Sequence, residues 1–238
     1  MPETESAMIT DIRASYAYHP GFQHYFWKWF ALGDFDEARL RQFALLYYQH
    51  VRRFRLYIAG AITIAPSEAL QRVLAENLAD EYGVALAGQP VADSHPEMYR
   101  KFMRSLGLSE ADWNNAEPIA GICRFQEIHF ALFRGGLVAE MIGAVVFGME
   151  SSTPYRHGSV VEGLKVFRPH SRLDIDATFF EAHVSGDEAH SRDLLNAAMP
   201  FIEADPEGVG RGARLSFDAR KLFLDDLAQA LNVSHVPS

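Results

Sequence analysis

A histidine and aspartate motif near the C-terminal end of the sequence has the residue types and spacing of a metal site. His183, Asp187 and His190 stand at positions i, i+4 and i+7 in the stretch FFEAHVSGDEAH. At ~100° per residue, a helix would place these three side chains in a narrow arc of one face. Imidazole nitrogen and carboxylate oxygen suit iron, manganese or zinc. The motif therefore predicts part of a metal site, although the same spacing is also typical of a solvated helix face.

Acidic residues earlier in the chain could complete such a site. Glu150 ends an apolar run over 141–149. A helix that is apolar on nearly all sides is buried, so this carboxylate must be paired, protonated or bound to a metal, unless it faces water beside Arg156. Glu81 closes an acidic stretch, and His95 follows after a loop, where it could turn inward as a ligand or be an ordinary first-turn residue.

The elements that must position these residues are expected to be helices joined by short loops. Asp34 and Ser67 have the character of N-caps, and Ser94 with Glu97 forms a capping-box pattern. We expect helices over 34–65, 67–83, 94–107, a short one from 109, and then 119–134, 137–152, 154–167, 174–203 and 213–231. Alternating strand patterns are nearly absent, so the chain is predicted to be an all-α bundle.

Length and composition favour one soluble domain over 1–238, with loose tails at 1–7 and 233–238. The chain has 238 residues, 48% of them hydrophobic, which is enough for one sizeable core. A net charge of −9 argues against nucleic-acid binding. The single cysteine, Cys123, excludes an internal disulfide and fits a reducing cytoplasm. The acidic N-terminus is unlike a signal peptide, and the most apolar stretch, 135–149, is too short to span a bilayer.

The order of these residues resembles that of the haem-oxygenase-like diiron oxidases, whose fold group also contains TenA thiaminases and PqqC. The resemblance extends over most of the chain, through FALLYYQHV at 43–51, the pair at 80–81, HPEMYRKF at 95–102 and ESSTP at 150–154. It implies a seven-helix bundle around two iron ions, or an iron–manganese pair, with dioxygen as co-substrate. The implied metal ligands are Glu81, His95, Glu150, His183, Asp187 and His190.

Within that resemblance, Glu81 and Glu150 are the implied catalytic carboxylates, and Glu150 bridges the two metals. Family members desaturate, N-oxygenate or cleave C–C bonds in amino acids, amines and fatty acids. The resemblance thus implies an oxidoreductase acting on a small molecule of this kind, and a homodimer, since members of the fold often dimerise. Helix position and resemblance together suggest a substrate pocket that contains Tyr47, Tyr48, His50, Phe54, Tyr57 and Met149.

The sequence is most similar to the CADD-like para-aminobenzoate synthases, which consume their own tyrosines and use a nearby lysine. Here Phe26 and Met149 stand where the tyrosines would align, and Val160 replaces the lysine. We therefore expect an external substrate rather than self-sacrificing chemistry.

Three other functions are compatible with the same fold. A TenA-like thiaminase needs a nucleophilic cysteine on the buried helix before Glu150, whereas Cys123 lies one helix earlier. A PqqC-like metal-free oxidase needs a ring of basic pocket residues that is not evident here. A non-catalytic interaction protein is the third alternative, and it predicts that the metal-binding residues do not converge.

Overall fold

The computed structural model describes residues 7–84, 92–184 and 191–234 in full, and residues 185 and 187–190 by their backbone helix alone. The described residues form helices joined by turns and loops, with no strand among them, so the all-α class is confirmed. The described helices are α1 (Ala7–Tyr16), α2 (Tyr25–Ala31), α3 (Glu37–Ile64), α4 (Glu68–Glu81), α5 (His95–Ser105), α6 (Glu110–Asn115), α7 (Ala120–Gly135), α8 (Val138–Gly143), α9 (Thr153–Phe167), α10 (Thr178–Ser185), α11 (Asp187–Ala204) and α12 (Pro206–Ala230).

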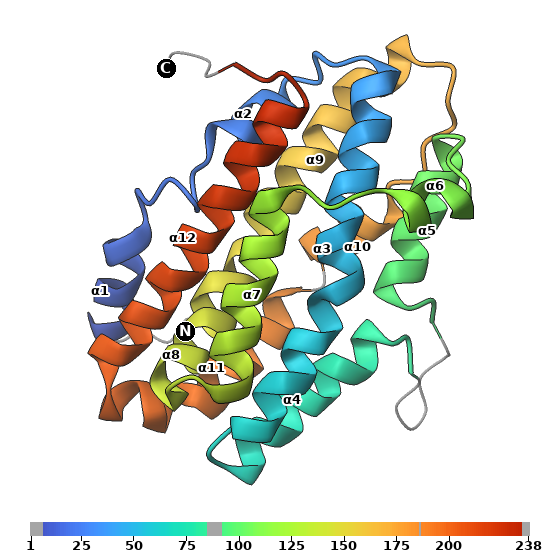
Figure 1. Cartoon of the computed structure of the whole chain (residues 1–238). Helices are drawn as coiled ribbons and strands as arrows, with labels where there is room; N and C mark the ends of the chain where they lie inside the picture. The colour runs from blue at the N-terminus through green and yellow to red at the C-terminus, as the bar shows by residue number, and fades with distance from the viewer. Residues whose placement is uncertain (1–6, 85–91, 186, 235–238) are drawn as a thin grey trace.

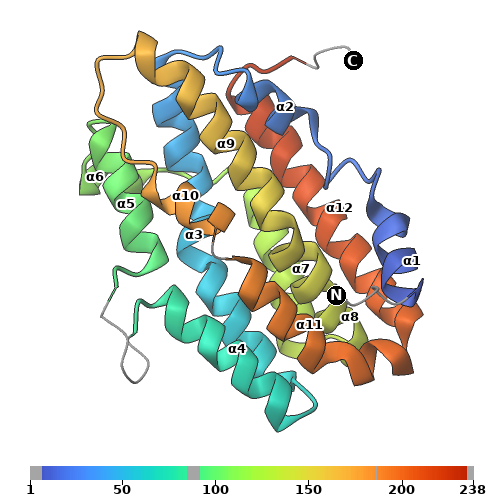
Figure 2. The same cartoon turned by 180° about the vertical axis from the view of Figure 1, so that it is seen from behind.

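The long helices α3, α7, α9 and α12 lie side by side and form the body of the bundle (Figures 1 and 2). α12 packs against α7 and α8, and α3 packs against α7 and α4. The shorter α10 lies between α9 and α5, so it brings the C-terminal third of the chain against two earlier helices. Within the described residues, no helix is both long and apolar enough to cross a membrane.

Side-chain caps fix where α4 and α5 begin, as the sequence predicted. The Ser67 hydroxyl accepts the N–H of Leu70 at 3.2 Å, and the Ser94 hydroxyl accepts that of Glu97 at 3.3 Å. The prediction for α3 was wrong by two positions. Its N-cap is Asp36, which accepts the N–H of Arg39 at 2.8 Å, and Asp34 lies outside the helix.

Other predicted boundaries need correction. The helix expected over 174–203 is two helices, α10 and α11, so His183 does not share a helix with Asp187 and His190. The last helix begins at 206 rather than 213, because Asp205 caps it and proline suits its first turn. Neither α1 nor α2 was predicted, since both are too short to show a clear helical period. Loose tails were predicted at 1–7 and 233–238. Of these residues, Ala7 lies in α1 and Val233 is buried, while 1–6 and 235–238 lie outside the described residues.

The helix expected over 137–152 changes its winding twice. α8 is followed by a π-helical segment, Ala144–Met149, and by a 3-10 turn, Glu150–Ser152. Such changes leave main-chain carbonyls without their usual helical donors, and short π-helical segments are frequent at functional sites. Here side chains replace those donors: Arg220 donates to the Gly148 carbonyl at 2.7 Å, and the Thr153 hydroxyl to that of Met149 at 2.9 Å.

Glycine at position 143 allows α8 to approach α12 closely. A Cβ there would overlap the main-chain carbonyl of Val209, which cannot move away without shifting α12. The Gly143→Ala substitution should therefore lower the free energy of unfolding by about 1–3 kcal/mol. Gly158, within α9, is the matched control because a Cβ there meets nothing within 4 Å. Gly158→Ala should stabilise by roughly 0.5–1 kcal/mol. Urea denaturation measures both, and similar shifts of the two variants would contradict the close approach.

Candidate metal centre

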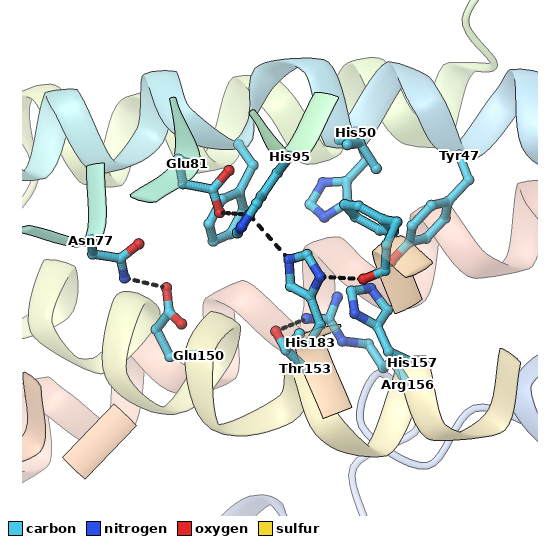
Figure 3. A pocket seen from close by; sticks show the side chains of 13 residues that line it. Tyr47, His50, Asn77, Glu81, His95, Glu150, Thr153, Arg156, His157 and His183 are labelled. Carbon is cyan, nitrogen blue, oxygen red and sulfur yellow. Dashed lines mark hydrogen bonds and ion pairs between the residues drawn. The ribbon is translucent and has the colours of Figure 1, made fainter. Parts of the chain in front are cut away.

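Three potential ligands from three different helices meet inside the bundle. Glu81 is the last residue of α4, His95 the first of α5, and His183 lies on α10. One ligand atom from each lies within 4.8 Å of the others. Nδ1 of His95 is 2.8 Å from Oε1 of Glu81 and 3.2 Å from Nε2 of His183 (Figure 3). The structure thus brings together half of the predicted ligand set around one point.

The local sequence accounts for how Glu81 and His95 face each other. α4 ends at Glu81, and Gly83 takes a positive φ of 65°, which favours glycine and turns the chain. A Cβ at Gly83 would also overlap the carbonyl of Ala92, so the main chain just before α5 lies against the turn that ends α4. Because Ser94 then caps α5, His95 falls in the first helical turn, beside the end of α4.

Hydrogen bonds orient both imidazoles toward the centre. Nδ1 of His183 donates to the carbonyl of Phe179 at 2.6 Å, which leaves the Nε2 lone pair directed at the cluster. On His95, Nε2 lies 3.5 Å from a carboxylate oxygen of Asp80, while Nδ1 faces the other two ligands. A metal-binding histidine generally has such a partner at its second nitrogen. Asp80 therefore acts as a positioning residue for His95.

The charges of the cluster suit a cation between its members. Burial opposes the charged form of His95, but Glu81 and Asp80 outweigh it and raise the pKa of His95 to about 10. Burial and the nearby His95 lower the pKa of His183 to about 3. Without an ion, His95 is therefore protonated, and its proton occupies the place that a metal cation would take among the three ligand atoms.

The other three predicted ligands differ in what the structure says of them. Glu150 is buried and accepts a hydrogen bond from Asn77 at 3.1 Å. It is not one of the three residues whose ligand atoms lie within 4.8 Å of one another. The side chains of Asp187 and His190 lie outside the described residues.

A small interior cavity adjoins the cluster and leaves ≈ 40 Å³ in which the centre of a water-sized molecule can move. That is room for a few water-sized groups. Figure 3 shows Asn77 and Glu150 at one end of it, the three clustered ligands in the middle, and Tyr47, His50 and His157 at the other end. The cavity is lined by Tyr47, His50, Val51, Phe54, Asn77, Glu81, His95, Glu150, Thr153, Arg156, His157, Phe179 and His183.

Half of the predicted pocket residues line this cavity. Tyr47, His50 and Phe54 do so because they lie at i, i+3 and i+7 on one face of α3. The remaining three, Tyr48, Tyr57 and Met149, are buried but do not line it.

Each of these three has other surroundings. The hydroxyl of Tyr48 accepts a hydrogen bond from Arg100 at 2.9 Å. Tyr57, on α3, packs edge-on against Phe130 of α7. Met149 belongs to the π-helical segment, whose winding differs from the α-helix on which its prediction relied.

Sequence reasoning missed four polar lining residues, which are Asn77, Thr153, Arg156 and His157. Their spacing carried a signal. Asn77 precedes Glu81 by four residues on α4, and His157 follows Thr153 by four on α9. Residues four apart share a helix face. Asn77 therefore faces inward with the predicted ligand Glu81, and Thr153 and His157 face inward together on the helix that follows the predicted ligand Glu150.

Two imidazoles and one carboxylate beside open space, once His95 has lost its proton, form the ligand set typical of non-haem iron oxygenases. The fold and this site together define an all-helical protein with a buried set of ligands that could hold a metal ion.

Comparison with known proteins identifies the family. The sequence profile of the iron-containing redox enzymes matches residues 41–221, and the chain belongs to that family. A 4-aminobenzoate synthase of Chlamydia pneumoniae is 30% identical over 203 residues, which cover 85% of this chain and 86% of that protein.

Solved structures agree on the fold. A CADD-like protein of unknown function from Nostoc punctiforme superposes with a TM-score of 0.77 at 16% identity, over 93% of this chain and 96% of that one. A domain with a haem-oxygenase-like fold from Shewanella denitrificans gives a TM-score of 0.64 at 15% identity, over 93% and 89% of the two chains. The predicted haem-oxygenase-like fold is therefore confirmed.

Metal binding at pH 7 should release about one proton from His95, because an imidazole must lose its proton to coordinate a metal. As the pH rises from 6.5 toward 10, the affinity for a divalent ion should therefore increase, by up to about tenfold per pH unit. Calorimetry of Zn²⁺ binding in buffers of different ionisation enthalpy measures the proton count. His95→Gln, which carries no titrating group, should release none, and a count of zero in the wild type would contradict the raised pKa.

Proposed function

We propose that this chain is a non-haem dimetal oxidase or oxygenase that uses dioxygen on a small organic substrate, such as an amino acid, an amine or a fatty acid. The observation that carries the proposal is the set of Glu81, His95 and His183 beside a cavity whose lining residues are mostly buried. Membership of the iron-containing redox enzymes supports iron as the metal.

The proposed centre holds two irons, or an iron–manganese pair. Glu81, His95 and His183 would bind one ion. Glu150 lines the same cavity, and with Asp187 and His190 it would supply ligands for the second, which the order of the six residues in the sequence supports. Glu150 remains the proposed bridge, held in place by the amide of Asn77.

When bound, iron supplies the one-electron chemistry of dioxygen that amino-acid side chains lack. The protein's own residues prepare the site for it. Asp80 and the Phe179 carbonyl fix the orientation of the two imidazoles. The aromatic walls Phe54 and Phe179 keep bulk water away from the reacting atoms.

An external substrate fits this chain better than consumption of its own tyrosines. Phe26 and Val160, which stand at the positions aligned with a tyrosine and the lysine of the CADD-like synthases, are fully buried and do not line the cavity. The similarity to a 4-aminobenzoate synthase of Chlamydia therefore supports an enzyme of the iron-containing redox family rather than one with the same product.

Loss of one ligand should lower the iron content. We expect purified wild type loaded anaerobically with Fe²⁺ to retain two irons per chain, and His183→Ala and Asp187→Ala to retain one or none, with loss of dioxygen consumption. His170→Ala is the control, since His170 is exposed on a 3-10 turn away from the cavity. Elemental analysis and an oxygen electrode provide the two measurements. Unchanged iron in His183→Ala would refute the proposed centre.

The thiaminase alternative makes an opposite prediction about cysteine. Cys123 lies on α7, half-buried, and is not among the described residues that line the cavity. Cys123→Ser should therefore leave both iron content and dioxygen consumption unchanged. Loss of all activity in this variant, with its iron retained, would instead favour a cysteine nucleophile.

A further inference from the structure

The end of the cavity away from Glu150 holds three buried polar side chains without partners. Tyr47, His50 and His157 are 1%, 5% and 4% exposed. The hydroxyl of Tyr47 and the Nδ1 atoms of both histidines have no hydrogen-bond partner among the described residues. The ring of Tyr47 lies 5.5 Å from that of His50 and 6.5 Å from that of His157, and all three residues line the same end of the cavity (Figure 3).

Leaving such groups unpaired costs free energy, and other buried histidines of the fold do not incur this cost. His129 is equally buried, yet Nδ1 donates to the Phe125 carbonyl at 2.8 Å and Nε2 accepts from Ser216 at 2.9 Å. His129 does not line the cavity. Among the buried histidines that the structure describes, Nδ1 has a partner in His24, His129 and His183. The two whose Nδ1 lacks one, His50 and His157, both line the cavity, where a ligand could complete their hydrogen bonds.

The charges at this end of the cavity select the kind of ligand. Arg156 is buried, lines the cavity and exerts its positive charge on His50, His157 and also His183, with its guanidinium bonded to the Thr153 hydroxyl at 2.7 Å. Arg220 adds a second positive charge that acts on His50. The lining acids that the structure describes, Glu81 and Glu150, lie toward the metal side (Figure 3). An anionic group would therefore be favoured beside Tyr47, and disfavoured beside the glutamates unless a metal is bound.

We propose that Tyr47, His50 and His157 form the subsite that binds the carboxylate of the substrate, so that the rest of the molecule extends toward His95 and His183. Each of the three can present an O–H or N–H to a carboxylate oxygen. With room for only a few water-sized groups, the cavity favours a short carboxylic acid. Describing this ligand as the substrate rests on the proposed oxidase function, whereas carboxylate binding itself does not.

The test measures binding of acetate, butyrate and benzoate, with the matching primary amides as neutral probes. Calorimetry and thermal shift are applied to the iron-loaded protein under argon and to the chelator-treated protein. The variant is Tyr47→Phe, which removes only the hydroxyl and keeps the ring. His157 is left intact because its ring lies 4.8 Å from that of the proposed ligand His183. Tyr57→Phe is the matched control, since Tyr57 is on the same helix with an equally buried, unpartnered hydroxyl but does not line the cavity.

At least one carboxylate should bind both forms of the wild type more tightly than its amide. Tyr47→Phe should weaken that binding roughly 10- to 100-fold, while Tyr57→Phe leaves it unchanged. Without ligand, neither variant should lower the melting temperature, because each removes an unpaired hydroxyl. Either of two results would overturn the subsite: amides that bind as tightly as acids, or carboxylates that bind only the iron-loaded protein and ignore Tyr47→Phe.

These readouts separate the subsite from the proposed function. Carboxylate binding that depends on Tyr47, in a protein that retains no iron, would preserve the subsite and refute the oxidase. Two retained irons with dioxygen consumption, but no carboxylate binding to either form, would refute the subsite and leave the oxidase standing.

Discussion

The site depends on holding a carboxylate and two imidazoles, from three separate helices, around one buried point. Each group alone would be costly to bury, and Glu81 the most. His95 resolves this by lying between the other two, 2.8 Å from Glu81 and 3.2 Å from His183. In the metal-free protein a proton on His95 balances the carboxylate, and the same geometry accepts a cation. Ligands already held in this arrangement would lower the cost of binding a metal ion.

A second constraint concerns the helix that leads into Glu150. A regular α-helix over 137–152 would present Glu150 on a face set by the residues before it. The π-helical and 3-10 segments change that rotation, and buried donors from α9 and α12 replace the missing main-chain bonds. Because the segment is enclosed by α12 at Gly143, the irregular backbone has little room to relax. The direction of the Glu150 carboxylate is thus determined by tertiary packing and not by local sequence.

This difference explains what the sequence could and could not predict. Local signals were sufficient for the caps at Ser67 and Ser94, and hence for the positions of Glu81 and His95 at facing helix ends. They failed for the motif at 183–190, where Ser185-Gly186-Asp187 is as typical of a helix junction as of a bend. The i, i+4, i+7 geometry was therefore wrong, although the choice of His183 as an inward residue agrees with its place in the cluster.

The role of Tyr47, His50 and His157 was hardest to predict, because it depends on hydrogen bonds that these side chains lack within the fold. Sequence patterns show where a histidine falls on a helix, and they treat His50, His129 and His157 alike. Only the fold shows that His129 is satisfied by main chain and serine, while the other two face a cavity. The cavity is consequently polarised, with carboxylates toward one end and cationic influence at the other. A molecule with an anionic group would therefore have one electrostatically favoured orientation in the cavity, and in the proposed oxidase this asymmetry would decide which end of the substrate meets the metal.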